Sequence, residues 1–257
     1  MRYKALDIVR PIEELAPIYT KESWDNCGFL IGDKDKYVSS ALLALDCSED
    51  VVDEAIKNGN DIIITHHPLI FSPLKSITPY TLAGRTIEKA IKNNIIIYAA
   101  HTNLDKAEQG LSKLMADSLS LINCSVLSKD GFGLVGEVKP ENKLYFHQLI
   151  ELLKKQFKVD IIRCSKPINS LITTIAVCSG SGQQFIGDAI EKKAQVYISG
   201  DISYHNFYVP NNMIVIDIGH YGSEFGVTKF LYNLVSKNFA NFAVSITEQN
   251  NNPIYYY

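Results

Sequence analysis

The stretch IIITHHP at residues 62–68 predicts a buried strand that ends in polar residues, because an apolar run is followed directly by two adjacent histidines. Three consecutive isoleucines are typical of a strand buried on both faces, as in a parallel sheet. Pro68 favours an extended or turn conformation in the residue before it, so the strand ends at the imidazoles. His66 and His67 are therefore either metal ligands at a strand end or a structural hydrogen-bonding pair, and this stretch alone does not separate the two.

Outward from this stretch, strand-like runs alternate with helix-like runs, which indicates the α/β class. In the first half we expect strands at residues 41–45, 61–64 and 95–99 and helices at residues 51–56 and 86–92. In the second half we expect strands at residues 131–138, 171–177, 195–198 and 213–218 and helices at residues 144–160 and 185–193. Ser48 is a suitable N-cap, and Gly59 a suitable stop, for the helix at residues 51–56.

These runs predict two related α/β lobes with a dinuclear metal site between them. Residues 1–128 form the first lobe, and residues 129–226 form the second, with the turn signal at residues 129–131 as the boundary. Residues 227–257 add a helix and a strand that return to the first lobe.

An internal repeat supports two related lobes. An offset of about 134 residues places Thr65, which ends one apolar strand, on Ser199, which ends another. A second alignment places His101 on His220 and Asp105 on Glu224. Parallel sheets bind ligands at the carboxyl ends of their strands, so both lobes carry polar turns where a site is expected.

Composition and charge exclude several classes of protein. The 257 residues carry a formal net charge of −3, without the basic footprint of a nucleic-acid-binding protein. No apolar run approaches the roughly 18 residues that span a bilayer, and the first residues lack a secretion signal, so we expect a cytoplasmic protein without a membrane partner. The five cysteines include no C-x-x-C pair, which argues against a cysteine zinc cluster or a disulfide scaffold.

Two further motifs pair a histidine with a carboxylate four residues later. His101 and Asp105 follow the strand at residues 95–99, and Asp105 is either a metal ligand or the N-cap of a following helix. His220 and Glu224 share one face if their segment is helical, and they are either metal ligands or an exposed ion pair.

Taken together, three imidazoles and two carboxylates exceed the needs of one tetrahedral zinc with an open position. They fit two divalent ions about 3.5–4 Å apart, as in two-metal hydrolases. The ligand set is His66, His67, Asp105, His220 and Glu224. Nitrogen and oxygen donors suit Zn, Mn or Fe, and also Co or Ni, and the residues do not choose among them.

Several other residues are candidates for supporting roles. His101 is a candidate for a metal ligand, for an orienting residue or for proton transfer. Asp201 and His205 are candidates for orienting a ligand or for proton transfer, or they lie in a solvated turn. Trp24 lies either in a substrate-facing loop or in a packed corner. The Gly/Ser-rich residues 178–182 form either an anion cradle or, as we favour, a plain turn.

These motifs resemble the NIF-three-like family, whose members are often labelled GTP cyclohydrolase I type 2 homologues. The resemblance is carried by SWDNCG at 23–28, THHPLIF at 65–71, HTNLD at 101–105, SGD at 199–201, Gly219-His220 and Ser223-Glu224. It covers nearly the whole chain and implies the same five ligands in a dinuclear site. It also implies a ring-shaped homohexamer whose sites face a central cavity.

Two functions follow as hypotheses. The first is a metal-dependent hydrolase acting on an unidentified small molecule, with GTP ring opening, phosphoester hydrolysis and amide hydrolysis all open. The second is a non-catalytic metal-binding or regulatory ring assembly. A scaffold without metal ranks below both, because it gives no reason for five polar ligands at strand ends.

Overall fold

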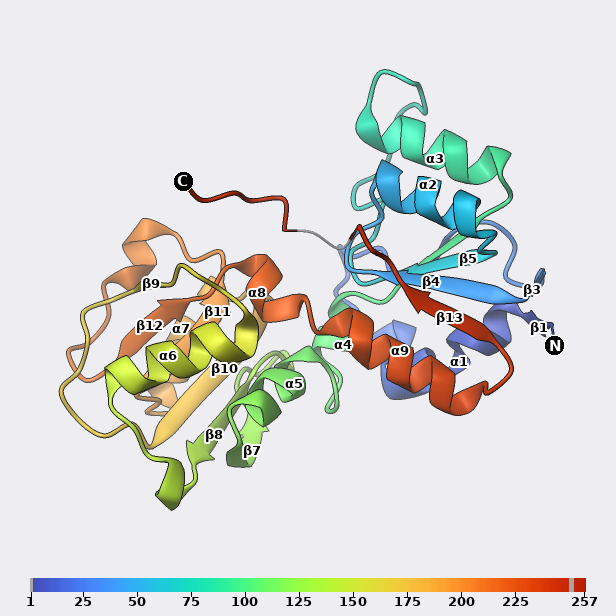
Figure 1. Cartoon of the computed structure of the whole chain (residues 1–257). Coiled ribbons are helices and arrows are strands. Elements are labelled where there is room, and N and C mark those ends of the chain that lie inside the picture. Colours follow the sequence, from blue (N-terminus) through green and yellow to red (C-terminus); the bar gives the residue numbers. More distant parts are fainter. Residues whose placement is uncertain (1, 250–251) are drawn as a thin grey trace. The chain divides into compact units, whose positions relative to one another are not determined.

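The computed structural model describes residues 2–249 and 252–257, so residues 1, 250 and 251 of the predicted lobes lie outside the described residues. The chain folds into two compact α/β units (Figure 1). Unit 1 comprises residues 1–104 and 226–253, and unit 2 comprises residues 105–225 and 254–257.

Unit 1 is built on a five-stranded sheet with the order β13-β4-β5-β6-β2. The first four strands are parallel and β2 is antiparallel to β6. The strands of unit 1 are β1 (Tyr3–Lys4), β2 (Gly28–Ile31), β3 (Tyr37–Val38), β4 (Ser40–Ala44), β5 (Ile62–Thr65), β6 (Ile96–Ala99) and β13 (Ala243–Ile246). The helices are α1 (Ala5–Leu15), η1 (Ile18–Thr20), α2 (Glu49–Asn58), α3 (Leu82–Lys92) and α9 (Val227–Asn238).

Helices cover both faces of this sheet, which is why its strands read as continuous apolar runs. Helices α2 and α3 lie on one face, and α1 and α9 lie on the other (Figure 1). Helix α2 begins and ends where the sequence predicts: the side chain of Ser48 accepts a hydrogen bond from the backbone N–H of Val51, and Gly59 adopts a left-handed φ of 67°.

Unit 2 is built on a six-stranded mixed sheet with the order β7-β8-β10-β11-β12-β9. Its strands are β7 (Leu121–Val126), β8 (Leu134–Val138), β9 (Arg163–Cys164), β10 (Thr174–Ser181), β11 (Val196–Gly200) and β12 (Ile214–Asp217). Its helices are α5 (Leu111–Ser118), η2 (Pro140–Asn142), α6 (Phe146–Phe157), η3 (Gln183–Phe185), α7 (Ile186–Glu191), η4 (Tyr204–Phe207) and α8 (His220–Glu224), and α4 (Thr102–Asp105) spans the boundary between the units.

The alternation of side chains along β10 builds two cores, one on each face of this sheet. Ile175 and Val177 pack in the cluster that contains Leu149 and Leu153 of α6. Ala176 packs in the other cluster, with residues of α7.

The repeat predicted from the sequence has a counterpart in the topology of each sheet. In unit 1, β4, β5 and β6 are adjacent and parallel, and the antiparallel strand β2 lies beside β6 at the edge of the sheet. In unit 2, β10, β11 and β12 are adjacent and parallel, and the antiparallel strand β9 lies beside β12 at the edge of the sheet.

The division between the units differs from the predicted boundary near residue 129. The turn at residues 128–132 connects β7 to β8, which pair as an antiparallel hairpin inside unit 2. Helix α5 packs beside them, with Met115 and Leu119 in the same core cluster as Ile175. These contacts place residues 105–128 in unit 2, whereas β13 pairs with β4 and belongs to unit 1.

Among residues 2–249 and 252–257, no helix combines the length and the apolar character needed to cross a bilayer.

Candidate metal centre

The carboxyl ends of β5 and β6 bring three histidines together in unit 1. The two strands are parallel, and Thr65 lies opposite Ala99, so the residues that follow both strands emerge at one edge of the sheet. His66, His67 and His101 each offer a ring nitrogen, and these atoms lie within 4.8 Å of one another. A group of three imidazole nitrogens at this spacing can hold a divalent ion.

The Nδ1 atom of each of these rings faces an oxygen that can only accept a hydrogen bond. The acceptor is the backbone carbonyl of Ala100 for His66, at 2.7 Å. It is a carboxylate oxygen of Asp46 for His67, at 2.7 Å, and of Asp25 for His101, at 2.9 Å. Nδ1 therefore carries the proton in each neutral ring, which leaves Nε2 as the lone-pair donor.

Asp25 is the buried anchor of this arrangement. Its side chain is fully buried, and it also accepts hydrogen bonds from the N–H and hydroxyl of Thr102. Burial would raise the pKa of Asp25, but hydrogen bonds from His101, Cys27 and Thr102 hold the pKa well below its usual range. The charged carboxylate of Asp25 fixes the orientation of the His101 ring.

Aromatic side chains surround His101 on its exposed side. The Trp24 ring is centred 5.7 Å from the Phe71 ring and 6.3 Å from the His101 ring. Trp24 is 58% exposed and Phe71 is 52% exposed. This exposure argues against a packed Trp corner and leaves an aromatic surface beside the histidines.

The carboxyl ends of β10 and β12 arrange a second group of ligands in unit 2. Helix α8 places His220 and Glu224 one turn apart, with Nε2 and Oε2 separated by 3.0 Å. A carboxylate oxygen of Asp105 lies within 4.8 Å of one of Glu224. Asp105 accepts a hydrogen bond of 2.9 Å from the hydroxyl of Ser179 in β10.

His220 shows the same Nδ1 pattern as the histidines of unit 1. Its Nδ1 lies 2.7 Å from a carboxylate oxygen of Asp201, so Asp201 fixes the direction of the His220 ring. Burial would lower the pKa of His220, but the carboxylates of Asp201 and Glu224 raise it to about 10. A divalent ion at Nε2 would take the place of that proton, since metal ligands bind in the deprotonated form.

Gly180 leaves room for the carboxylate of Glu224. The residue has a φ of +61°, and a Cβ at this position would lie 2.4 Å from Oε1 of Glu224. The Gly/Ser-rich residues 178–181 are therefore part of β10 and contact two acidic side chains, Asp105 and Glu224, rather than forming the plain turn that the sequence favours.

The chemistry of the donors fits divalent ions of the zinc, manganese or iron type, because the candidate ligands are imidazoles and carboxylates. Cys178 joins none of the groups of potential metal ligands among the described residues, and its burial, together with the charge of Asp105, raises its pKa well above the ordinary value.

His205 is placed differently from the other histidines predicted at the site. It lies exposed in η4, with its ring against that of Tyr204 at 5.3 Å. It joins none of the groups of potential metal ligands within residues 2–249 and 252–257.

Asp25 and Asp46 are partners of histidines that were not predicted from the sequence. Asp46 follows β4 by two residues, at the edge where His66 and His67 follow β5, and this position was the available signal. Asp25 lies in the loop before β2 and reaches His101 through a long-range contact that no local pattern reveals.

Comparison with known proteins identifies the family. Residues 3–253 match the family Duf34/NIF3 (NGG1p interacting factor 3), and the chain belongs to it. A protein of Clostridium perfringens named "GTP cyclohydrolase 1 type 2 homolog" is 39% identical over 87% of this chain and 88% of its own length. A protein of Clostridium acetobutylicum with the same name is 36% identical over 98% of both chains.

The fold is shared with solved structures. The crystal structure of a Bacillus cereus protein related to NIF3 superimposes with a TM-score of 0.92, at 24% identity, over 100% of this chain and 99% of the other. At this identity the likeness shows the mixed α/β fold alone. The match to the family over residues 3–253 and the two clostridial relatives confirm the family resemblance that the motifs indicate.

Proposed function

We propose that this chain is a metal-dependent hydrolase whose dinuclear site uses His66, His67, Asp105, His220 and Glu224. The observation that carries the proposal is the common arrangement of the histidines. Each ring donates its Nδ1–H to a carboxylate or a backbone carbonyl, so a metal ion would bind at Nε2. Metal-ligating histidines almost always show this pattern, because the outer hydrogen bond fixes the tautomer and the direction of the ring.

The connectivity of the chain supports one shared site rather than two separate ones. The chain passes from unit 1 to unit 2 between Leu104 and Asp105, and back again between Phe225 and Gly226. Asp105 and Glu224 thus lie at or beside these passages, and His101 lies just before the first of them. We propose that the ligands of the two units meet at these passages.

When bound, two divalent cations supply Lewis acidity and an acidified water. Asp25 holds the ring of His101 so that Nε2 can take up or deliver a proton. The exposed rings of Trp24 and Phe71 offer a planar substrate a surface beside His101. The name of the clostridial relatives makes GTP the first substrate to try, and His205 remains a prediction as a second proton carrier.

The experiment is a screen of GTP, phosphoesters and amides with protein supplied with Zn, Mn or Fe(II). We expect turnover by the natural protein and a loss of about 10²–10⁴-fold in His101→Gln, with metal content unchanged because His101 is outside the five proposed ligands. A fall in metal content would instead make His101 a ligand, together with His66 and His67. His147→Gln is the matched control, because His147 is an exposed histidine of α6. Equal turnover by the two variants would contradict the role of His101.

The passages between the units also favour a second function, in which the ions act mainly on structure. Ligands that adjoin both passages would link the two units, so bound metal would stabilise the fold without turnover. This function, in a ring-shaped homohexamer, becomes the better account if every substrate fails while two ions stay bound. Native mass spectrometry with and without chelator tests both the ring and its dependence on metal.

A further inference from the structure

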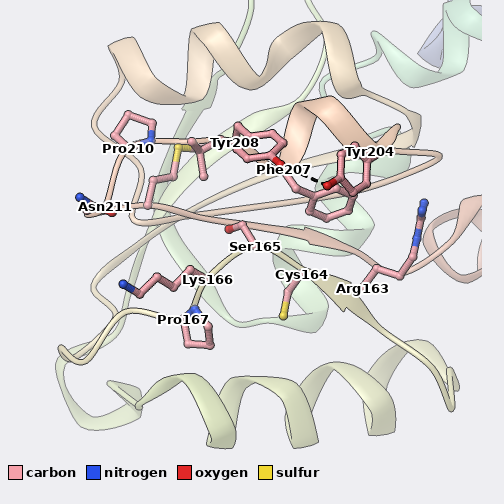
Figure 2. Close-up of a pocket in the computed structure, with 12 residues that line it drawn as sticks. Arg163, Cys164, Ser165, Lys166, Pro167, Tyr204, Phe207, Tyr208, Pro210 and Asn211 are labelled. Atoms are coloured by element: carbon pink, nitrogen blue, oxygen red, sulfur yellow. Dashed lines mark hydrogen bonds between the residues drawn. The ribbon is translucent and has the colours of Figure 1, made fainter.

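Unit 2 contains a cavity of about 650 Å³ that the proposed metal site does not use. It lies between η4 with the loop that follows it and β9 with the residues that follow that strand (Figure 2). Small-molecule sites occupy about 300–1,000 Å³, so the cavity has room for a ligand of that kind.

One wall of the cavity is aromatic. Tyr204, Phe207 and Tyr208 line it together, and the two tyrosine hydroxyls lie 3.1 Å apart. Tyr204 is 69% exposed and Tyr208 is 75% exposed, although large aromatic side chains usually bury most of their surface. The planes of the two tyrosine rings differ by 75°, so a planar ligand ring can stack on the face of one and meet the edge of the other.

The opposite wall carries positive charge. Arg163 lies at one end of the cavity and Lys166 lies toward the other (Figure 2). Lys166 is exposed and forms no ion pair among the described residues of the chain. No Asp or Glu is among the described residues that line the cavity, and Asp217 neutralises Arg163, so Lys166 provides the charge that attracts an anion.

Arg163 is held in place before any ligand arrives. Its guanidinium donates to the buried carboxylate of Asp217 and, at 2.8 Å, to the carbonyl of Ile202. It also lies over the ring of Phe207, with Cζ 5.5 Å from the ring centroid. Asp217 in turn accepts a hydrogen bond of 2.8 Å from the N–H of Gly219, in the turn that leads to His220.

We propose that this cavity is a mononucleotide site, in which the base stacks on Tyr208 and the phosphate is bound by Lys166. The combination of an aromatic wall, the charge of Lys166 and this volume selects an anion that carries a planar ring. The site is separate in its residues from the proposed metal ligands, so it stands or falls independently of the hydrolase.

The test is calorimetric titration of the full chain with AMP and GMP, with adenosine and ribose 5-phosphate as the two halves of the ligand. We expect AMP or GMP to bind at least tenfold more tightly than either half. Lys166→Ala and Tyr208→Leu should each weaken binding at least fivefold, through loss of the charged contact and of the stacking surface. Arg163 is left intact, because its removal would also disturb Asp217 and the turn before His220.

Matched controls separate this cavity from the metal centre. Lys155→Ala and Tyr19→Leu remove an exposed lysine and an exposed tyrosine outside the cavity, and they should bind nucleotide as the natural chain does. Cys164, an exposed cysteine in the lining, provides a second readout: bound nucleotide should slow its alkylation.

Three results would overturn the proposal. The first is the absence of binding by both nucleotides at millimolar concentration. The second is binding of adenosine or ribose 5-phosphate as tight as that of the nucleotides. The third is nucleotide binding that Glu224→Ala abolishes and Lys166→Ala leaves unchanged, with no slowing of Cys164 alkylation. The nucleotide would then bind at the metal centre.

Discussion

Replacing Gly180 with alanine should remove metal binding while the fold survives. A Cβ at this position would lie 2.4 Å from Oε1 of Glu224, whereas ordinary contact begins at 3.4 Å. The carboxylate must therefore retreat by about 1 Å, and metal–ligand distances tolerate only about 0.2 Å. We expect metal affinity to fall about 100-fold, which is the upper end of the losses caused by changes around a metal ligand.

The cost to the fold should be much smaller. Alanine at a φ of +61° costs about 1–2 kcal/mol, which lowers the Tm of a chain of this size by roughly 2–8 °C. Gly187→Ala is the matched control, because a Cβ there would meet nothing within 4 Å and Gly187 lies in helix α7. The assay is elemental analysis together with thermal unfolding with and without added metal. A folded Gly180→Ala protein that retains the metal content of the natural chain would refute the placement of Glu224.

Three further predictions concern residues around the two ligand groups. Asp201→Asn removes the charged acceptor at Nδ1 of His220 and should weaken metal binding about 10–100-fold in a competition assay with a chelating dye; unchanged affinity would contradict the role of Asp201. The pKa of Asp25 is lowered in the folded chain, so its contribution to stability is present above about pH 4 and is lost as the pH falls further. Asp25→Asn should lower the free energy of unfolding in urea by about 2 kcal/mol at pH 7, and this difference should shrink toward pH 3. A difference that stays constant with pH would count against this assignment. Cys164 is exposed, whereas burial and the neighbouring acidic charge raise the pKa of Cys47 to about 12; a thiol reagent at pH 8 should label Cys164 first and Cys47 only on unfolding, as mass spectrometry of digested protein can check.

The parts of the fold predicted from the sequence are those with strong local signals. Ser48 and Gly59 bound helix α2 as expected, because a side-chain cap and a left-handed glycine act within a few residues of the helix end. The isoleucines of β5 are buried on both faces, as their continuous apolar run predicts. The return of residues 243–246 to β4 also follows the sequence expectation, and β13 pairs with that strand.

The parts that differ depend on contacts between distant segments. The signal at residues 129–131 does mark a turn, but that turn joins β7 and β8 within one sheet. Which sheet residues 105–128 join is decided by the packing of α5 and β7 against β8 and β10, and no local pattern encodes that choice. The antiparallel edge strand β2 was not predicted for the same reason.

The candidate site likewise contains residues that could be predicted from the sequence and contacts that could not. His66, His67 and His101 could be found because polar residues at the ends of apolar strands stand out in the sequence. Asp25 could not be paired with His101 in advance, since 76 residues separate them and the carboxylate reaches the ring only in the folded unit.

The central claim is that the five ligands hold two divalent ions in each chain. The most direct measurement is the metal content of gently purified protein, compared with Glu224→Ala and with Glu191→Ala as the matched control, because Glu191 is an exposed glutamate at the end of α7. We expect close to two ions per chain in the natural protein and in Glu191→Ala, and a clear loss in Glu224→Ala. Absence of bound metal after soaking in Zn, Mn or Fe, or an undiminished content in Glu224→Ala, would contradict the claim.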